Sequence, residues 1–261
     1  MDLQLTGRRA LVMSSSRGLG AGIARALAAE GAEVLLTGRS GDRLAALAAE
    51  ITAAGPGRAS HVVADLTDPG SAAVLADAAD AMDGVDILVA NTGGPPPGRM
   101  VDIDPAMVPA QLDTMVVRVI EVAARLVPGM RARGWGRIVV VASSGVVQPI
   151  PTLGLSNLAR SALVGWAKSM AGDLAAEGIT VNMLLPGRIH TARLDELDSA
   201  AATRTNTTLE EVREASRAAV PAGRYGTVEE FAATAAFLCS GPASYVTGSM
   251  VRCDGGLIRS V

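Results

Sequence analysis

Short runs of apolar residues alternate with longer, alanine-rich stretches along the whole of this 261-residue chain. The runs are almost continuously apolar, which is typical of a parallel strand covered on both of its faces. The longer stretches are apolar at the three- to four-residue spacing of a helix. This pattern predicts strands at Ala10–Met13, Val34–Thr37, Ser60–Val63, Ile87–Ala90, Ile138–Ala142, Thr180–Leu185 and Met250–Arg252.

The helical stretches fall between these strands. In the first of them Ile23 and Leu27 share one apolar face, and Gly31 is placed to end the helix. The alternation predicts an α/β fold in which residues 1–261 form a single domain, a doubly wound parallel sheet of the Rossmann type with right-handed crossovers. The expected helices are Gly20–Glu30, Asp42–Ala54, Pro69–Met82, Pro105–Ala132, Ser156–Glu177 and Val228–Cys239.

Residues 191–222 break this alternation, because they are polar, charged and only weakly periodic. Folds of this class bind their ligands outside the carboxyl ends of the strands. We therefore expect residues 191–222 to form a short mobile lid over those ends.

Composition narrows the classes of function. A net charge of -3 without clustered Lys and Arg argues against a nucleic-acid surface. No apolar run is long enough to cross a bilayer, and the N-terminus shows no secretory signal. Cys239 and Cys253 are too few for a disulfide framework and fit a reducing cytoplasm. Two cysteines and two histidines without close spacing predict no metal site.

The segment Ser14–Gly20, which we call the glycine loop, lies between the first strand and the first helix. Glycines at such a turn let the backbone approach a pyrophosphate, which the free N–H groups of the helix N-terminus attract. A plain tight turn would use glycines in the same way, but the position after the first strand favours dinucleotide binding. The candidate contacts are Ser14, Ser16, Arg17, Gly18, Leu19 and Gly20.

Further motifs follow the later strands: Asp65-Leu66, Asn91-Thr92-Gly93-Gly94, and Pro186-Gly187-Arg188-Ile189-His190-Thr191. With the glycine loop they resemble, over essentially the whole chain, the short-chain dehydrogenase/reductase family and its 3-oxoacyl-carrier-protein-reductase-like branch. The resemblance implies that Asp65 meets the adenine and that Ile189 and Thr191 flank the nicotinamide carboxamide. An aspartate in a turn would also explain Asp65. Other cofactor contacts implied by the resemblance are Leu66, Asn91, Gly93, Pro186 and Gly187.

The end of the second strand points to the type of cofactor. Family members that bind NAD carry an acid there, whereas this chain reads Thr37-Gly38-Arg39. Arg39 and Arg17 could form a cationic pocket for a 2′-phosphate, or both could be solvated surface residues. We expect NADP, with NAD as the second choice.

The resemblance also implies a catalytic serine followed, about a dozen residues later, by Tyr-x-x-x-Lys. By this spacing the serine is Ser143, the tyrosine position holds Ser156, and the lysine position holds Arg160, which would also contact the ribose. A serine hydroxyl reaches less far than a phenol and is a poorer acid, and a guanidinium stays charged. The asparagine that anchors the family's proton-relay water falls near Met115. Ser143 could instead have its hydroxyl satisfied by nearby backbone.

These residues predict an oxidoreductase acting on a small carbonyl or alcohol, with a non-standard proton path through Ser143, Ser156, water or His190. An imidazole titrates near neutral pH, although His190 could equally be a lid residue that faces outward. The alternative is a catalytically weak or silent dinucleotide-binding protein that senses cofactor or supports a partner subunit. The resemblance also implies a homotetramer or dimer, paired through the helices expected at Pro105–Ala132 and Ser156–Glu177.

Overall fold

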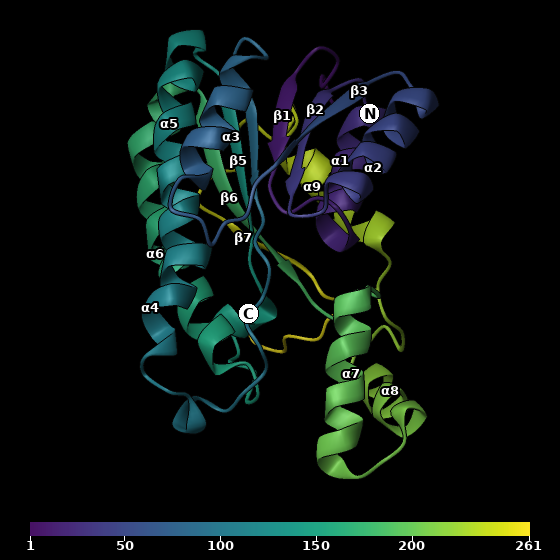
Figure 1. Cartoon of the computed structure of the whole chain (residues 1–261). Coiled ribbons are helices and arrows are strands. Elements are labelled where there is room, and N and C mark those ends of the chain that lie inside the picture. Colours follow the sequence, from purple (N-terminus) through teal and green to yellow (C-terminus); the bar gives the residue numbers. More distant parts are fainter.

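Seven parallel strands form one sheet in the order β3-β2-β1-β4-β5-β6-β7, in a computed structural model that describes residues 1–261 (Figure 1). Every pair of neighbouring strands is parallel. The doubly wound sheet predicted from the sequence is therefore confirmed. The strands are β1 (Arg9–Val12), β2 (Glu33–Gly38), β3 (Arg58–Val63), β4 (Ile87–Ala90), β5 (Gly136–Val141), β6 (Ile179–Pro186) and β7 (Met250–Cys253).

Helices cover both faces of the sheet and enclose two apolar cores (Figure 1). One face carries α1 (Gly18–Ala29), α2 (Gly41–Ala54) and α9 (Val228–Leu238). The other carries α3 (Ser71–Asp80), α5 (Arg118–Arg133) and α6 (Gly154–Leu174). None of the helices is both long enough and apolar enough to cross a membrane.

The strand β3 departs from the expectation of burial on both faces. It pairs with β2 alone, and most of its residues are exposed or half-buried. Val63, for example, is 52% exposed. An edge strand of an open sheet lacks a neighbour on one side, so its apolar residues are less enclosed than those of a central strand.

The helix expected at Pro105–Ala132 is interrupted. It consists of α4 (Met107–Leu112), a π-helical turn at Asp113–Val117, and then α5. Met115 lies in the π-turn and is 1% exposed in the core. A π-turn adds one residue to the helical repeat and is frequent near functional sites.

The segment 191–222, expected to be weakly structured, folds largely into two helices, α7 (Ala192–Thr205) and α8 (Leu209–Ala218). They project beyond the carboxyl ends of the strands, where Figure 1 shows them as a lobe apart from the main body. Each has a capped start: the Thr191 side chain accepts from the Leu194 N–H, and Thr208 forms a capping box with Glu211. We continue to call residues 191–222 the lid.

The amino ends of the strands are tied together by a buried carboxylate. Asp86, immediately before β4, is 3% exposed. It accepts hydrogen bonds from the Arg9 backbone N–H at 3.0 Å and from Arg133 Nε at 2.8 Å, and Arg9 Nε lies 3.4 Å away. The three residues connect β1, β4 and the end of α5.

We expect Asp86→Ala to lower the free energy of unfolding by about 3 kcal/mol, because it leaves two arginines without their buried partner. Urea unfolding followed by circular dichroism measures this. The control is Glu50→Ala, which removes an exposed ion pair with Arg25 and should cost less than about 1 kcal/mol. Equal losses in the two variants would contradict the role given to Asp86.

Candidate active site

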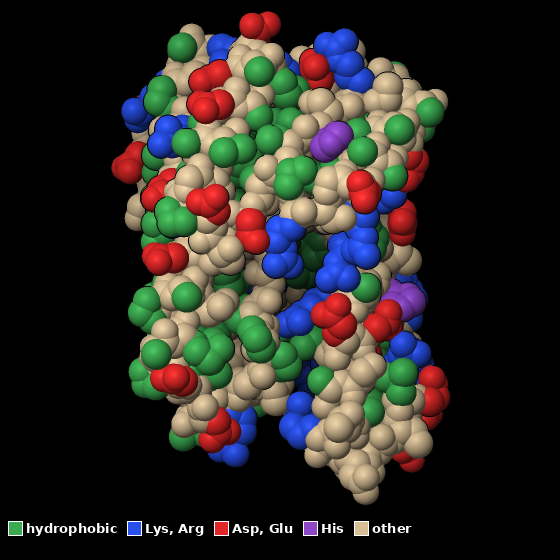
Figure 2. All heavy atoms as spheres, in the orientation of Figure 1, with side chains coloured by type: hydrophobic (Ala, Val, Ile, Leu, Met, Phe, Trp, Pro, Cys, Tyr) green, Lys and Arg blue, Asp and Glu red, His purple; other side chains and the backbone are tan.

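Most of the predicted site residues lie at or after the carboxyl ends of β1, β4, β5 and β6, and Arg39 and Asp65 follow the ends of β2 and β3. The order of strands reverses between β1 and β4, and such a reversal opens a crevice at the carboxyl edge. A space-filling view shows a hollow between the main body and the lobe of α7 and α8, with Lys and Arg side chains gathered around it (Figure 2).

The glycine loop is closely packed against its neighbours. A Cβ on Gly20 would lie 2.6 Å from the Ser14 carbonyl oxygen and 2.9 Å from Ser15 Cα. Gly18 has a φ of +60°, which favours glycine, and Ser14 has a left-handed φ of 49°. The Ser14 carbonyl also accepts a hydrogen bond from Asn91 Nδ2 at 3.2 Å. The loop is thus fixed to the end of β4.

The N-terminus of α1 is open to an anion. The residue that precedes it, Arg17, makes no side-chain capping bond, so the N–H groups of the first turn remain free. These groups and the helix dipole attract negative charge. The loop therefore fits the pyrophosphate of a dinucleotide.

A second hollow, of about 390 Å³, lies beside the glycine loop between α1 and α2. Ser16, Arg17 and Arg43 are among the residues that line it. Arg25 is also there but is paired with Glu50 at 2.7 Å, whereas Arg43 makes no ion pair. Sequence reasoning missed Arg43, although its place in the first turn of the second helix was a usable signal.

Asp65 forms the turn that was the alternative interpretation of this residue. Its Oδ1 accepts the Thr67 backbone N–H at 3.0 Å, which forms a turn. This hydrogen bond lowers the pKa of the carboxyl, and the nearby Arg39 lowers it further. The side chain of Leu66 is buried in the core, so Leu66 offers the site only its backbone.

Arg160 reaches the crevice from α6 and is buried. Its Nη1 donates to the Val141 carbonyl at 2.7 Å and its Nη2 to the Thr92 carbonyl at 3.5 Å. It has no carboxylate partner, and burial lowers its pKa to about 10. The guanidinium is therefore still charged at neutral pH. The Thr92 hydroxyl is also buried and has no hydrogen-bond partner.

Ser143 lies two residues after Val141, whose carbonyl binds Arg160, and Ser156 lies on α6 with Arg160; each carries a hydroxyl group. Ser143 Oγ accepts the Gly145 N–H at 3.0 Å, as the backbone-satisfied interpretation predicted, but its own hydrogen remains available to donate. Ser156 lies one turn before Arg160 on α6, is 8% exposed, and makes no hydrogen bond to the protein.

Asn157 supports this part of the site and was not singled out from the sequence. Its Oδ1 accepts the Ile150 N–H at 3.3 Å, and its Nδ2 donates to the Ile150 carbonyl at 2.9 Å. The two bonds fix the segment that precedes α6 to the first turn of that helix.

The segment after β6 is held between the core and the lid. A Cβ on Gly187 would lie 2.6 Å from Asp254 Cα. Ile189 is buried and forms a parallel bridge with Gly226. A Cβ on Gly18 would lie 3.8 Å from Thr191 Cγ2, so the lid begins beside the glycine loop.

The helix α7 contacts both sides of the crevice. Arg193 Nη2 donates to the Pro95 carbonyl, after β4, at 2.8 Å. Glu196 lies 3.6 Å from Arg17 of the glycine loop. The first two turns of α7 therefore close over the crevice from one rim to the other.

The two histidines lie apart from these groups. The His190 side chain is 65% exposed and lies 3.7 Å from Asp195, which agrees with the outward-facing interpretation. His61 is exposed on the edge strand β3. No group of three or more His, Cys, Asp or Glu residues is arranged to hold a metal ion.

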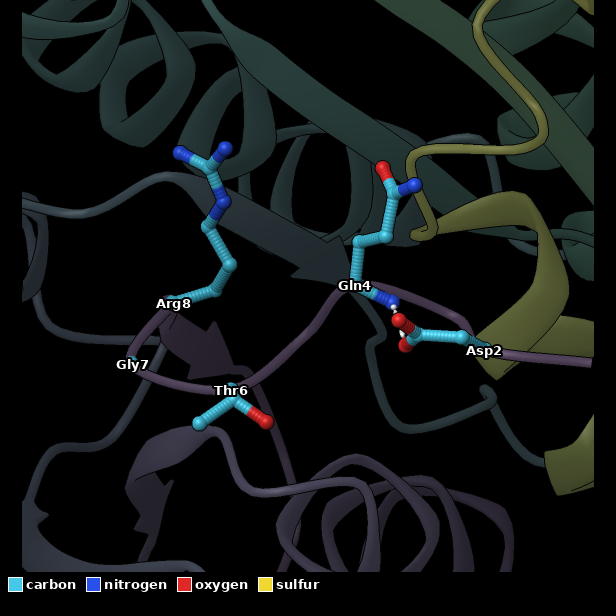
Figure 3. A pocket seen from close by; sticks show the side chains of 5 residues that line it. All are labelled: Asp2, Gln4, Thr6, Gly7 and Arg8. Carbon is cyan, nitrogen blue, oxygen red and sulfur yellow. Dashed lines mark hydrogen bonds between the residues drawn. The ribbon is translucent and has the colours of Figure 1, made fainter.

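A polar hollow of about 450 Å³ before β1 does not belong to the site. Figure 3 shows its lining side chains spread along the N-terminal segment rather than converging on one point. It lies at the amino ends of the strands, opposite the crevice, and no hydrophobic residue lines it. Its lining residues are Asp2, Gln4, Thr6, Gly7 and Arg8.

Comparisons with known proteins agree with this geometry. The sequence profile described as enoyl-(acyl carrier protein) reductase matches residues 13–258. Nodulation protein G of Rhizobium sp. (strain N33) is 35% identical over 257 residues, covering 97% of this chain and 98% of the relative. The 3-oxoacyl-[acyl-carrier-protein] reductase of Vibrio cholerae is 34% identical, covering 98% and 99%. The structure of Gluconobacter frateurii L-sorbose reductase, complexed with NADPH and L-sorbose, is 29% identical, with a TM-score of 0.94 and full coverage of both chains.

We expect Gly20→Ala to lower the free energy of unfolding by about 1–3 kcal/mol, because its Cβ would press on the Ser14 and Ser15 backbone. Thermal or urea unfolding of the cofactor-free protein measures this. Gly93→Ala is the control in the same crevice, since nothing lies within 4 Å of its Cβ. It should change stability by less than about 0.5 kcal/mol. Equal effects would show that close packing of the glycine loop is not what requires glycine at residue 20.

Proposed function

This chain belongs to the short-chain dehydrogenase/reductase family, and we propose that it transfers a hydride between NADP(H) and a small carbonyl or alcohol substrate by a non-standard proton path. The observation that carries the proposal is the crevice. It joins an uncapped helix N-terminus, a glycine that cannot accept a Cβ, and a buried cation facing the ends of β4 and β5.

The residues of the crevice fit a dinucleotide along its length. The glycine loop would hold the pyrophosphate, Asp65 the adenine, and Arg160 the ribose hydroxyls next to the nicotinamide. When bound, the nicotinamide supplies or accepts the hydride. The residues proposed to hold the cofactor are Ser14, Ser16, Arg17, Gly18, Leu19, Gly20, Arg39, Asp65, Leu66, Asn91, Gly93, Arg160, Pro186, Gly187, Ile189 and Thr191.

Charge at the adenosine end favours NADP over NAD. The end of β2 carries Gly38 and Arg39 and no carboxylate. Arg17 and Arg43 line the adjacent hollow; Arg17 lies 3.6 Å from Glu196, whereas Arg39 and Arg43 lie within 4 Å of no carboxylate. A 2′-phosphate in this hollow would receive charge-assisted hydrogen bonds. The NADPH complex of the L-sorbose reductase supports the same choice.

The proton path is the unusual part of the proposal. We place Ser156 and Arg160 where the family has its tyrosine and lysine, and Met115 where it has the asparagine. Ser143 would donate a hydrogen bond to the substrate oxygen. Arg160, with a pKa of about 10, remains protonated at neutral pH and cannot relay a proton there. Ser156, which has no partner in the protein, is then free to hold a water that delivers the proton.

The lid is proposed to select the substrate, because α7 closes the crevice from both rims. We further propose that the protein acts in the cytoplasm as a homotetramer or dimer. Two free cysteines fit the location. The exposed apolar side chains Val117 of the π-turn and Leu158 of α6 support pairing through the long helices.

One observation favours a second function. The crevice offers no side chain whose ordinary pKa is matched to proton transfer at neutral pH, because His190 faces outward. The chain would then be a catalytically silent dinucleotide-binding protein, a sensor or a supporting subunit. Tight NADPH binding without turnover on a broad panel of carbonyl compounds would favour it over the first proposal.

We expect NADPH to bind more tightly than NADH, and Arg39→Ala to weaken NADPH binding about tenfold through loss of a charge-assisted hydrogen bond. NADH affinity should stay unchanged. Isothermal titration with both cofactors measures this, with Arg58→Ala as the control because Arg58 is exposed at the amino end of β3, away from this hollow, and is paired with Glu33. Equal affinity of the wild type for both cofactors would contradict the 2′-phosphate pocket.

We expect the combined change Ser156→Tyr, Arg160→Lys and Met115→Asn to raise turnover of simple ketones. A positioned general acid contributes about a hundred- to ten-thousand-fold. Each single change should do little, because the donor, its partner and the water anchor act together. NADPH oxidation by wild type and variants on one substrate panel measures this. If the wild type turns over a substrate quickly and the triple variant loses that activity, the site has its own efficient proton route.

A further inference from the structure

A buried carboxylate lies at the base of the lid, outside the crevice residues described above. Asp198 of α7 is 2% exposed. Its Oδ2 accepts a hydrogen bond from the Tyr225 hydroxyl at 2.8 Å, and its Oδ1 lies 3.5 Å from Arg188 Nη1. Burial raises the pKa of the Tyr225 phenol, so it remains a donor at neutral pH.

Both partners of Asp198 belong to the segments that hold Ile189 in place. Arg188 directly precedes Ile189, and Tyr225 directly precedes Gly226. The backbone N–H of Gly226 donates to the Arg188 carbonyl at 2.9 Å, and the His190 N–H donates to the Gly226 carbonyl at 2.9 Å. The two segments form a short parallel bridge, and Asp198 fastens both sides of it to α7.

A second carboxylate extends the connection to α8. Asp195, one turn earlier on α7, accepts a hydrogen bond from Arg213 of α8 at 2.7 Å. The same oxygen lies 3.7 Å from His190 Nε2. The segment Arg188–His190 is therefore tied to the lid through side chains on both sides of Ile189, and to the main body through its own backbone.

Stability alone does not call for a carboxylate at this point. Burying a charge is costly, and an apolar side chain of similar size often stabilises a fold as well or better. The carboxylate instead fixes the orientation of two segments relative to α7, since one of its oxygens binds Tyr225 and the other lies beside Arg188.

We propose that Asp198 is a positioning residue that, through Arg188 and Tyr225, orients the segment carrying Ile189 and Thr191 toward the nicotinamide end of the cofactor. The inference rests on the proposed function. It implies that the network contributes to binding of the nicotinamide half of NADPH and contributes nothing to binding of the adenosine half.

Two ligands separate the halves of the cofactor: NADPH, and 2′,5′-ADP, which lacks the nicotinamide and its ribose. Both are titrated into the full-length wild type, Tyr225→Phe, Asp198→Asn and Asp198→Ala. We expect Tyr225→Phe to raise the Kd of NADPH about tenfold, because the segment that it releases must then be ordered when NADPH binds. Asp198→Ala should raise the Kd of NADPH further than Tyr225→Phe does. Asp198→Asn keeps an acceptor for Tyr225 and should therefore raise this Kd less than Asp198→Ala. The Kd of 2′,5′-ADP should stay within about twofold in every variant.

Glu214→Ala is the control, since Glu214 is an exposed carboxylate of α8 without a hydrogen bond or ion pair. It should change neither affinity. Unchanged binding of 2′,5′-ADP also shows that a variant is folded. If Asp198→Ala fails to fold, the result for Tyr225→Phe, which keeps the aromatic ring, decides the test. Equal weakening of both ligands, or unchanged NADPH binding, overturns the positioning role. A wild type that binds neither ligand overturns the proposed function as well.

Discussion

The reversal of strand order between β1 and β4 is the constraint on which the site depends. The chain leaves β1 toward one face of the sheet and β4 toward the other, so the connections that follow the two strands separate and a crevice opens between those connections. Asn91 keeps the two ends in register through its hydrogen bond to the Ser14 carbonyl, across 77 positions of sequence. The sheet below is rigid and packed on both faces, and the lid above makes contact with both rims.

A cation inside this crevice has to be stabilised without a counter-ion. Arg160 achieves this with main-chain carbonyls at the ends of two neighbouring strands, which present partial negative charge to it. Desolvation makes the charged form less favourable, but not enough to remove the proton at neutral pH. The crevice therefore holds a buried positive charge at neutral pH, held in place by backbone carbonyls alone.

Elements marked by a continuous run of apolar residues could be predicted from the sequence. Elements held in place by specific polar contacts could not. All seven strands lie within two residues of their predicted bounds, and the central ones could be predicted because they are apolar on both faces. The lid helices were missed since their apolar faces are narrow, although Thr208 and Glu211 already formed a capping signal. The residues that follow each strand could be assigned to the crevice, because parallel strands all end at one edge. Contacts such as Asn157 with Ile150 depend on how loops fold, and periodicity carries no information about them.

The π-turn at Asp113–Val117 has a consequence for how this region can change over evolution. One additional residue in a helix rotates everything beyond it by about 100° around the helix axis. Deleting a single residue here would restore an ordinary helix but turn α4 away from its present packing, along with the loop that connects it to β4. The side chain of Met115 is constrained separately, by its packing in the core, where it is 1% exposed. The number of residues in this region is therefore constrained by the π-turn, and the identity of its buried side chains by the core.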